Sequence, residues 1–275
     1  MATKSQAPYE NNPFMLGIEG LKLIFDRAKG IGIYSIVLTG TTFLLAIVFY
    51  VANLIAQAMT SSEESSYEAQ AFAPQPAEIA GIVGLVVLGT LVYMAISLLL
   101  FGVLEYGAAM AAKGKRAGLK EGFLVVLRQF PAYFWMYLLF TIKVLLWSLL
   151  LIVPGIIMFN RYILAGTVFF AEGKRGNAAL KRSAELTKGA WLTTYGGAWI
   201  WSIISQGIAT LVFWPGCMAV LYRQLADVTD RGEPKSPAHI LSWLTLLVPF
   251  ALAALYIVFI IMLFVLLAAT GTAAP

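Results

Sequence analysis

The sequence has little charge and few of the residues that build catalytic or redox centres. Only 12% of its residues are charged and 60% are hydrophobic, whereas a soluble domain carries about 25% charged residues. The single cysteine, Cys217, excludes an internal disulfide, a CxxC redox pair and a cysteine-rich zinc site. The single histidine, His239, argues against a His-based metal site or a catalytic triad. The composition therefore points away from soluble enzymes and towards a membrane protein.

Motifs for nucleotide and hydrolase chemistry are also missing. The Gly-Lys pairs lack the spacing of a P-loop, no GxSxG occurs, and one histidine cannot form HExxH. The net charge of +5 comes mostly from short basic blocks beside apolar segments, which is typical of cytoplasmic membrane loops and not of a nucleic-acid groove. We therefore expect no enzyme activity, no cofactor, no metal site and no nucleic-acid partner.

Long apolar runs fill most of the chain. A helix needs ~20 mostly apolar residues to cross the hydrocarbon layer, and Ile31–Met59 and Ile79–Met110 both exceed that length. The pattern predicts an all-α, polytopic transmembrane bundle, with a cytoplasmic tail at 1–13 and one membrane domain at 14–275. The expected membrane segments are 31–59, 78–111, 132–153, 156–171, 191–212, a short 215–225, and 243–267. Counting the short segment gives seven crossings, and leaving it out gives six.

Proline and glycine mark several of the expected boundaries. Pro131 is expected to separate an interfacial stretch from the third membrane helix, and Pro154-Gly155 to form a tight turn. Trp214-Pro215-Gly216 interrupts a run that is too long for one crossing, and the return arm after it is short enough to be partly re-entrant. Ser236-Pro237 resembles an N-cap followed by proline at the first helical position.

Three stretches between these runs are amphipathic, at 14–29, 119–130 and 177–188. The apolar series of the first is Phe14, Ile18, Leu21, Phe25 and Ala28. Asn177 is a plausible N-cap for the third. Such helices lie in the headgroup layer with their apolar face down. They either bind the anionic inner leaflet or only orient the bundle.

The charges of the loops indicate an orientation. The second membrane segment ends at Lys113, Lys115 and Arg116, and the fourth ends at Lys174 and Arg175. The connection at 61–77 has three glutamates and no Lys or Arg. Basic loops stay in the cytoplasm, so we expect a cytoplasmic N-terminus, cytoplasmic basic loops and cytoplasm-side amphipathic helices.

One arrangement occurs twice: an interfacial helix, a membrane helix, a return helix and a basic loop. It covers Phe14–Arg116 and then Leu119–Arg175. Gly114-Lys115-Arg116 and Gly173-Lys174-Arg175 occupy matching places in the two units. Either the units are a true internal repeat, or both loops converged on the same basic composition.

Three ionisable residues lie within apolar segments, where charge is costly and is often kept for function. Lys143 lies in the third segment, Arg161 in the fourth, and Glu105 towards the cytoplasmic end of the second. They predict a pocket for an anionic lipid headgroup, a proton relay, or structural pairing within the membrane. Only Glu105 supplies an acid near membrane depth, which favours pairing over a relay.

The region from Ile152 to Leu225 carries a recognisable motif. It consists of Pro154-Gly155, Arg161, Ala179-Leu180-Lys181, Ser183, Leu186-Thr187, Gly189 and Leu221-Tyr222-Arg223. It resembles a group of poorly characterised bacterial polytopic membrane proteins that includes the membrane domain of some membrane-anchored glycerophosphodiester phosphodiesterases. The resemblance implies a helical domain in a bacterial inner membrane. It implies no activity, because in that group the phosphodiesterase chemistry belongs to a separate soluble domain.

Our leading hypothesis is a non-enzymatic accessory or scaffold protein that binds membrane lipids, another membrane protein or a second copy of itself. The candidate lipid or partner contacts are Lys143, Arg161, Lys181, Arg182, Lys188 and Arg223, with Glu105 as a candidate for intramembrane pairing. The alternative is a small transporter or permease for an anionic or lipid-like substrate. It draws on Lys143, Arg161 and the expected helix break at Pro215.

Overall fold

The computed structural model describes residues 10–61 and 76–271, and every regular element in these ranges is an α-helix. The helices are α1 (Pro13–Arg27), α2 (Lys29–Ser61), α3 (Pro76–Ala112), α4 (Leu119–Leu150), α5 (Ile152–Tyr162), α6 (Ala165–Glu172), α7 (Asn177–Thr187), α8 (Trp191–Ile204), α9 (Thr210–Asp230) and α10 (Ile240–Gly271). The all-α prediction is confirmed. Most of the predicted N-terminal tail, most of the acidic connection and the last four residues lie outside the described ranges.

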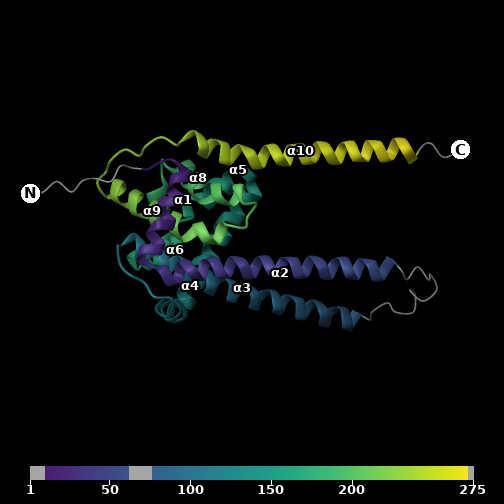
Figure 1. Ribbon diagram of the computed structural model, residues 1–275, viewed down its shortest axis with the longest axis horizontal. Coiled ribbons are helices and arrows are strands. Elements are labelled where there is room, and N and C mark those ends of the chain that lie inside the picture. The colour runs from purple at the N-terminus through teal and green to yellow at the C-terminus, as the bar shows by residue number, and fades with distance from the viewer. Residues whose placement is uncertain (1–9, 62–75, 272–275) are drawn as a thin grey trace, which may run out of the picture.

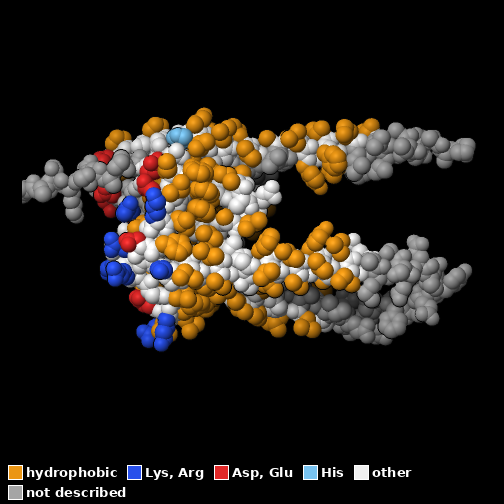
Figure 2. All heavy atoms as spheres, viewed as in Figure 1, with side chains coloured by type: hydrophobic (Ala, Val, Ile, Leu, Met, Phe, Trp, Pro, Cys, Tyr) orange, Lys and Arg blue, Asp and Glu red, His pale blue; other side chains and the backbone are white. Residues whose placement is uncertain are grey.

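The helices form a packed body with two apolar arms (Figure 1). The body contains α1, α4 to α9 and the ends of the long helices that pack on them. The first arm is the outer part of α2 and α3, which run side by side, and the second is the outer part of α10. Charged side chains gather at the end of the body away from the arms, and hydrophobic side chains cover the arms (Figure 2).

Four helical stretches of the described chain are long and apolar enough to cross a membrane. They are Lys29–Ile55, Val83–Ala112, Leu119–Leu150 and Val153–Glu172. This composition is compatible with a membrane location. The α8 helix has only 14 residues, or ~21 Å at 1.5 Å per residue. The outward helix of the α8–α9 hairpin is therefore the short one, whereas the sequence suggested a short return.

Two prolines that were expected to end helices lie inside them. Pro131 lies within α4, so the interfacial stretch 119–130 and the third membrane segment form one helix. Pro215 lies within α9, which has 21 residues. Both predicted breaks are wrong. Proline removes a single backbone hydrogen bond, and a helix packed among neighbours continues past that loss.

The chain turns at other positions. Leu151 alone joins α4 to α5, in an extended conformation, so that Pro154-Gly155 falls in the first turn of α5 and not in the loop. Between α8 and α9 the turn contains Gln206 and Gly207, both with positive φ. The N-cap side chain before α10 is His239, whose Nδ1 accepts a hydrogen bond from the Leu241 N–H at 3.2 Å. The predicted helix start at Ser236-Pro237 is therefore wrong.

The first amphipathic helix packs through small residues. Leu16, Gly17, Gly20 and Ile24 form the buried face of α1. At Gly20 the backbone comes so close to α9 that an added Cβ would lie 2.3 Å from the carbonyl carbon of Gly216. The predicted apolar face, from Phe14 to Phe25, is only half-buried beside this stripe. Helix α1 is thus built into the body.

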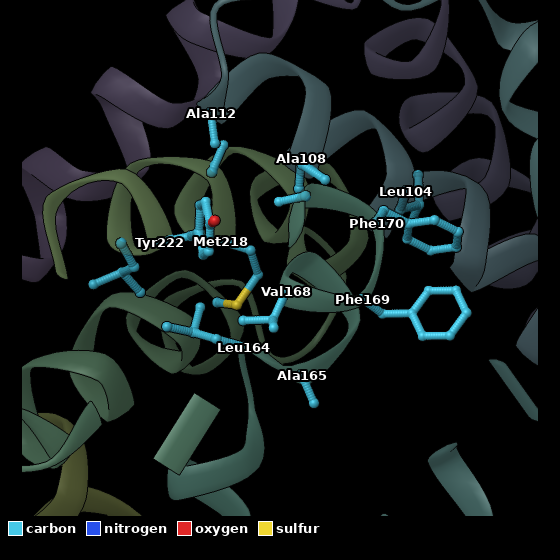
Figure 3. Packing of buried hydrophobic residues seen from close by; sticks show 14 of the residues in the cluster. Leu104, Ala108, Ala112, Leu164, Ala165, Val168, Phe169, Phe170, Met218 and Tyr222 are labelled. Atoms are coloured by element: carbon cyan, nitrogen blue, oxygen red, sulfur yellow. The ribbon is translucent and has the colours of Figure 1, made fainter. Parts of the chain in front are cut away.

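The α6 helix fills the centre of the body. Seven of its eight residues are buried, all except Glu172. Val168 lies on the side of α6 that faces Met218 of α9, and Phe170 lies beside Leu104 of α3 (Figure 3). The rings of Phe169 and Phe170 contact Tyr133 of α4, with centroids 5.5 Å and 5.3 Å away. The predicted fourth segment is thereby divided into α5 and α6 by a break at Ile163 and Leu164.

The two predicted units are followed by a further group of three helices, α7 to α9, although the second unit differs in that its interfacial and membrane parts form one helix, α4, and its return is divided into α5 and α6. Gly114, Gly173 and Gly232 each follow a return helix with φ of +69°, +69° and +67°, and as their numbers show, they are equally spaced along the chain. The first unit comprises α1 to α3, the second α4 to α6, and the third α7 to α9. A left-handed glycine ends many helices, so this agreement does not separate a true internal repeat from similar basic loops, and the repeat stays a prediction.

Candidate functional site

The Glu105 carboxylate is buried where α3, α6 and α9 meet. Its Oε2 accepts a hydrogen bond from Thr167 Oγ1 at 2.9 Å, and its Oε1 accepts one from Trp214 Nε1 at 3.1 Å. A Cβ at Gly166 would lie 2.6 Å from Oε2, so a glycine is needed for this approach. Sequence reasoning expected a basic partner. Within the described residues, neutral donors pair this carboxylate instead.

A second acid, Glu172, joins α6, α7 and α9 at the charged end of the body. Arg182 Nε lies 3.1 Å from its Oε1, Lys174 Nζ lies 2.7 Å from its Oε2, and the Tyr222 hydroxyl donates to it at 3.1 Å. The Arg182 guanidinium also contacts Asp230 at 2.6 Å. Burial acts to lower the pKa of Arg182, but its hydrogen bonds and charge contacts with Asp230 and Glu172 outweigh burial and raise it. Arg182 is thus committed to the fold and is not free for a lipid phosphate.

Ser183 and Thr187, both in the motif, stabilise the break between α5 and α6. Ser183 Oγ donates to the Arg161 carbonyl at 2.9 Å and accepts from the Leu164 N–H at 3.2 Å. Thr187 Oγ1 donates to the same carbonyl at 3.1 Å. These bonds replace helix bonds lost at the break. The polar part of the motif therefore has a structural explanation.

The Arg161 and Lys143 side chains make different contacts and share no hydrogen-bond partner. The Arg161 guanidinium contacts the Met158 sulfur at 3.9 Å. Lys143 Nζ donates to Asn177 Oδ1 and lies 5.6 Å from the centroid of the Tyr162 ring. Asn177 is therefore not the N-cap of α7, which is Gly176. The Asn177 side chain joins α7 to α4, because it accepts a hydrogen bond from Lys143, a cation that the sequence placed within a membrane segment.

Three of the predicted contact residues are exposed cations. Lys181 and Lys188 lie on α7 and directly after it, and Arg223 lies on α9, which packs against α7. Across residues 10–61 and 76–271, the structure gives none of these three side chains an ion pair or a hydrogen bond. These groups are available for an anionic partner at the charged end of the body.

Lys235 fastens the connection before α10 to the end of α7. Its Nζ donates to the carbonyl oxygens of Glu185, Leu186 and Lys188. These carbonyls lie at the C-terminal end of the helix, and that of Glu185 also accepts a hydrogen bond from the Lys188 N–H at 3.3 Å. Burial, with the nearby charges of Arg182 and Lys188, lowers the pKa of Lys235. Sequence reasoning missed this contact, because no local pattern links residues so far apart.

An open groove with a volume of about 440 Å³ lies between α4, α5 and α8. Its walls include Val144 and Ser148 of α4, Ile156 and Phe159 of α5, and Tyr195 and Trp199 of α8. Asn160, which is fully buried, also lines it. The Asn160 Nδ2 donates to the Ile156 carbonyl at 2.8 Å, whereas its Oδ1 has no hydrogen-bond partner among the described residues. Sequence reasoning noticed Asn160 only as the neighbour of Arg161.

In the part of the chain that the structure describes, no three His, Cys, Asp or Glu side chains are grouped so that they could hold a metal ion. What the structure brings together is a charged end with free cations, two acids that each join three helices, and an open apolar groove. Comparison of this chain with protein-family models, curated proteins and solved structures found no match.

Proposed function

We propose that this chain is a non-enzymatic integral membrane protein that serves as an accessory or scaffold and binds lipids in the plane of the bilayer. The observation that carries the proposal is the division of its surface. Charged side chains gather at one end, and exposed hydrophobic side chains cover the two arms (Figure 2). An anionic leaflet attracts basic groups beside a hydrocarbon-embedded surface.

The proposed topology follows from the same division. The charged end lies in the cytoplasm, with the N-terminus, and the arms reach across a bacterial inner membrane. Helices α2, α3, α4 and the α5–α6 pair are four crossings. The α8–α9 hairpin and α10 bring the count to six or seven, depending on whether the short α8 reaches the far side. The starts of α1 and α4 and the whole of α7 lie near the interface.

The lipid contacts that we assign to the cytoplasmic face are Lys181, Lys188 and Arg223. Each is exposed and has no acidic partner among the described residues. Arg182, by contrast, is held by two acids and is assigned to the fold. A lipid phosphate at this face would be bound by lysine and arginine groups that keep access to water.

The test is the retention of anionic lipid by the whole protein. The protein is placed in nanodiscs of phosphatidylglycerol and phosphatidylcholine, released in the gas phase, and the bound lipids are counted by native mass spectrometry. Changing Lys181, Lys188 and Arg223 together to glutamine should lower the phosphatidylglycerol retained at least threefold. The control is Arg231→Gln, because Arg231 is already paired with Asp227 and Glu233. Equal retention by the triple variant and the control would refute the assignment.

Native mass spectrometry of a second preparation addresses the partner half of the proposal. A protein partner, or a second copy, at fixed stoichiometry after gentle extraction from native membranes would support a scaffold. The transporter alternative has lost two of its supports, because α9 continues through Pro215 and Lys143 is bonded to Asn177. The resemblance to bacterial membrane domains fits the accessory function and stays a prediction.

A further inference from the structure

Two cations of the α4–α5 hairpin have no acidic partner. Lys143 lies in α4, and Arg161 lies in the last turn of α5. Across residues 10–61 and 76–271, neither side chain takes part in an ion pair. The proposed topology places both helices in the bilayer, where a cation without a counter-ion is costly. An anion from outside the chain that reaches both groups would lower that cost.

Both cations lie where α4 and α5 meet α7. The Lys143 ammonium lies 5.6 Å from the centroid of the Tyr162 ring, and it donates to Asn177 of α7. Arg161 precedes Tyr162 in the chain, and its charge acts on the Tyr162 side chain. The Arg161 carbonyl accepts a hydrogen bond from Thr187 of α7 at 3.1 Å. The junction of the three helices therefore places both cations beside Tyr162.

Both charged groups have unused donors and access to the surface. An ammonium has three N–H donors, and Lys143 uses one of them in its exposed bond to Asn177 Oδ1. A guanidinium has five, and the Arg161 group contacts only the Met158 sulfur, a weak acceptor, at 3.9 Å. Both side chains are half-buried and not closed off. An anion outside the body can therefore reach them.

Exposed apolar side chains continue from Lys143 towards the α4–α5 turn. Leu146 and Leu150 lie three and seven residues after Lys143, which places them on the same side of α4, and both are exposed. Trp135, eight residues before Lys143, is exposed as well, and tryptophan is typical of the headgroup layer. An anionic group at Lys143 would therefore lie between a headgroup-layer position and a surface for hydrocarbon.

The charge of the two side chains indicates the kind of anion. A phosphate monoester carries a charge of about −1.5 to −2 at pH 7, and nearby cations favour its doubly charged form. A phosphodiester headgroup, such as that of phosphatidylglycerol, carries a single negative charge. Arginine also binds phosphate through two N–H groups at once. Two unpaired cations therefore match a phosphate monoester better than a diester.

We propose that Lys143 and Arg161 bind a phosphate monoester, the headgroup of a lipid of the phosphatidic acid class. The inference rests on the proposed lipid-binding function and deepens it, because it adds a second site with its own headgroup. Free phosphate shares this chemistry. The exposed Leu146 and Leu150 beside the site favour the lipid as its source.

The experiment uses the full chain in nanodiscs of phosphatidylcholine with equal amounts of phosphatidylglycerol and phosphatidic acid, whose acyl chains differ in mass. The lipids retained after release in the gas phase are counted by native mass spectrometry. We expect the ratio of retained phosphatidic acid to phosphatidylglycerol to exceed the offered ratio at least threefold. Excess inorganic phosphate should leave this ratio unchanged, and its loss would overturn the lipid as the source.

A matched pair of double variants tests the two cations. Lys143→Gln with Arg161→Gln should return the ratio to the offered one. Lys120→Gln with Arg128→Gln is the control, because it removes the same charge from exposed positions of α4, and it should leave the ratio unchanged.

A further variant neutralises Lys143 in place. Asn177→Asp keeps the oxygen that accepts from the Lys143 ammonium and adds a negative charge beside it. The retained ratio should fall although both cations are still present. This variant keeps the proposal testable if the double variant fails to fold.

Two results would overturn the inference. The first is retention of the two lipids by the original protein in the offered ratio. The second is an equal fall of the ratio in both double variants, which would show a general effect of charge. The basic face is tested separately, by the total phosphatidylglycerol retained when Lys181, Lys188 and Arg223 are changed. The failure of this site and the failure of the basic face can therefore be told apart.

Discussion

The glycines of the body and those of the arms have opposite surroundings. In the body, Gly20, Gly166 and Gly216 each lie where an added Cβ would come within 3 Å of a neighbouring helix. In the arms, Gly40 and Gly84 have nothing within 4 Å of that position. The body is therefore held by close helix contacts, of the kind that small residues allow in membranes. The apolar surface of the arms stays exposed to the surroundings of the protein.

Among variants of the body and the arms, we expect the largest loss of unfolding free energy at Glu105, which lies in the body. Glu105→Ala leaves the Trp214 N–H and the Thr167 hydroxyl without an acceptor in a buried site. At about 1–3 kcal/mol for each donor, the loss in unfolding free energy is about 2–6 kcal/mol. Thermal unfolding in detergent, followed by tryptophan fluorescence, measures it.

The control for this variant is Glu185→Ala. Glu185 is exposed and has one long ion pair with Arg182, at 3.7 Å. Its removal should change stability by less than about 1 kcal/mol. If both variants unfold at the same temperature, Glu105 does not join the three helices in the way described.

The next largest effect is expected where α1 crosses α9. Gly20→Ala places a methyl group against the Gly216 backbone, which has no flexible side chain to move aside. Overpacking of this kind costs about 1–3 kcal/mol. Unfolding temperature should fall, and limited proteolysis should reach the N-terminal segment sooner.

Gly84→Ala in α3 provides the opposite case, because its added Cβ meets open space. Alanine also has the better helix propensity, by about 1 kcal/mol. This variant should be as stable as the original protein or slightly more so. A loss of stability equal to that of Gly20→Ala would mean that the arm is packed against something other than lipid.

A smaller effect is expected at the α5–α6 break. Ser183→Ala removes one bond to the Arg161 carbonyl and one from the Leu164 N–H. Thr187 still donates to that carbonyl, so the expected loss is about 1 kcal/mol. Thr41→Ala is the control, since Thr41 bonds only the Val37 carbonyl of its own exposed helix. Hydrogen exchange at Leu164 should rise in the first variant and stay constant in the second.

The sequence predicted the membrane class and the long helices because apolar length is a property of the sequence alone. The first two segments agree with α2 and α3 to within a turn. The free cations Lys181 and Lys188 were also found from helical spacing. These features depend on residues close together in the chain.

The features that were missed depend on distant neighbours. Pro131 and Pro215 were expected to break helices, which is the correct local rule, but packing carries both helices through. The partners of Glu105 come from α6 and α9, and no spacing rule links them. The turn at Gln206 and Gly207 before α9 lies inside the segment 191–212, which was predicted as one crossing. The groove beside Asn160 forms only when α4, α5 and α8 are packed together.

The smallest effect is expected on the arm itself, at Phe49. Its side chain is 73% exposed, whereas Leu104 in the body is fully buried. Leu104→Ala is the control from the body and belongs with the large effects, because truncation of a buried leucine costs about 2–5 kcal/mol. Phe49→Ala creates no cavity, so its unfolding free energy in detergent should change by no more than about 0.5 kcal/mol. A large loss at Phe49 that appears only after gentle extraction from native membranes would place a protein partner, and not lipid, on this arm. That outcome would turn the unoccupied surface of α2 into the interface that the scaffold proposal requires.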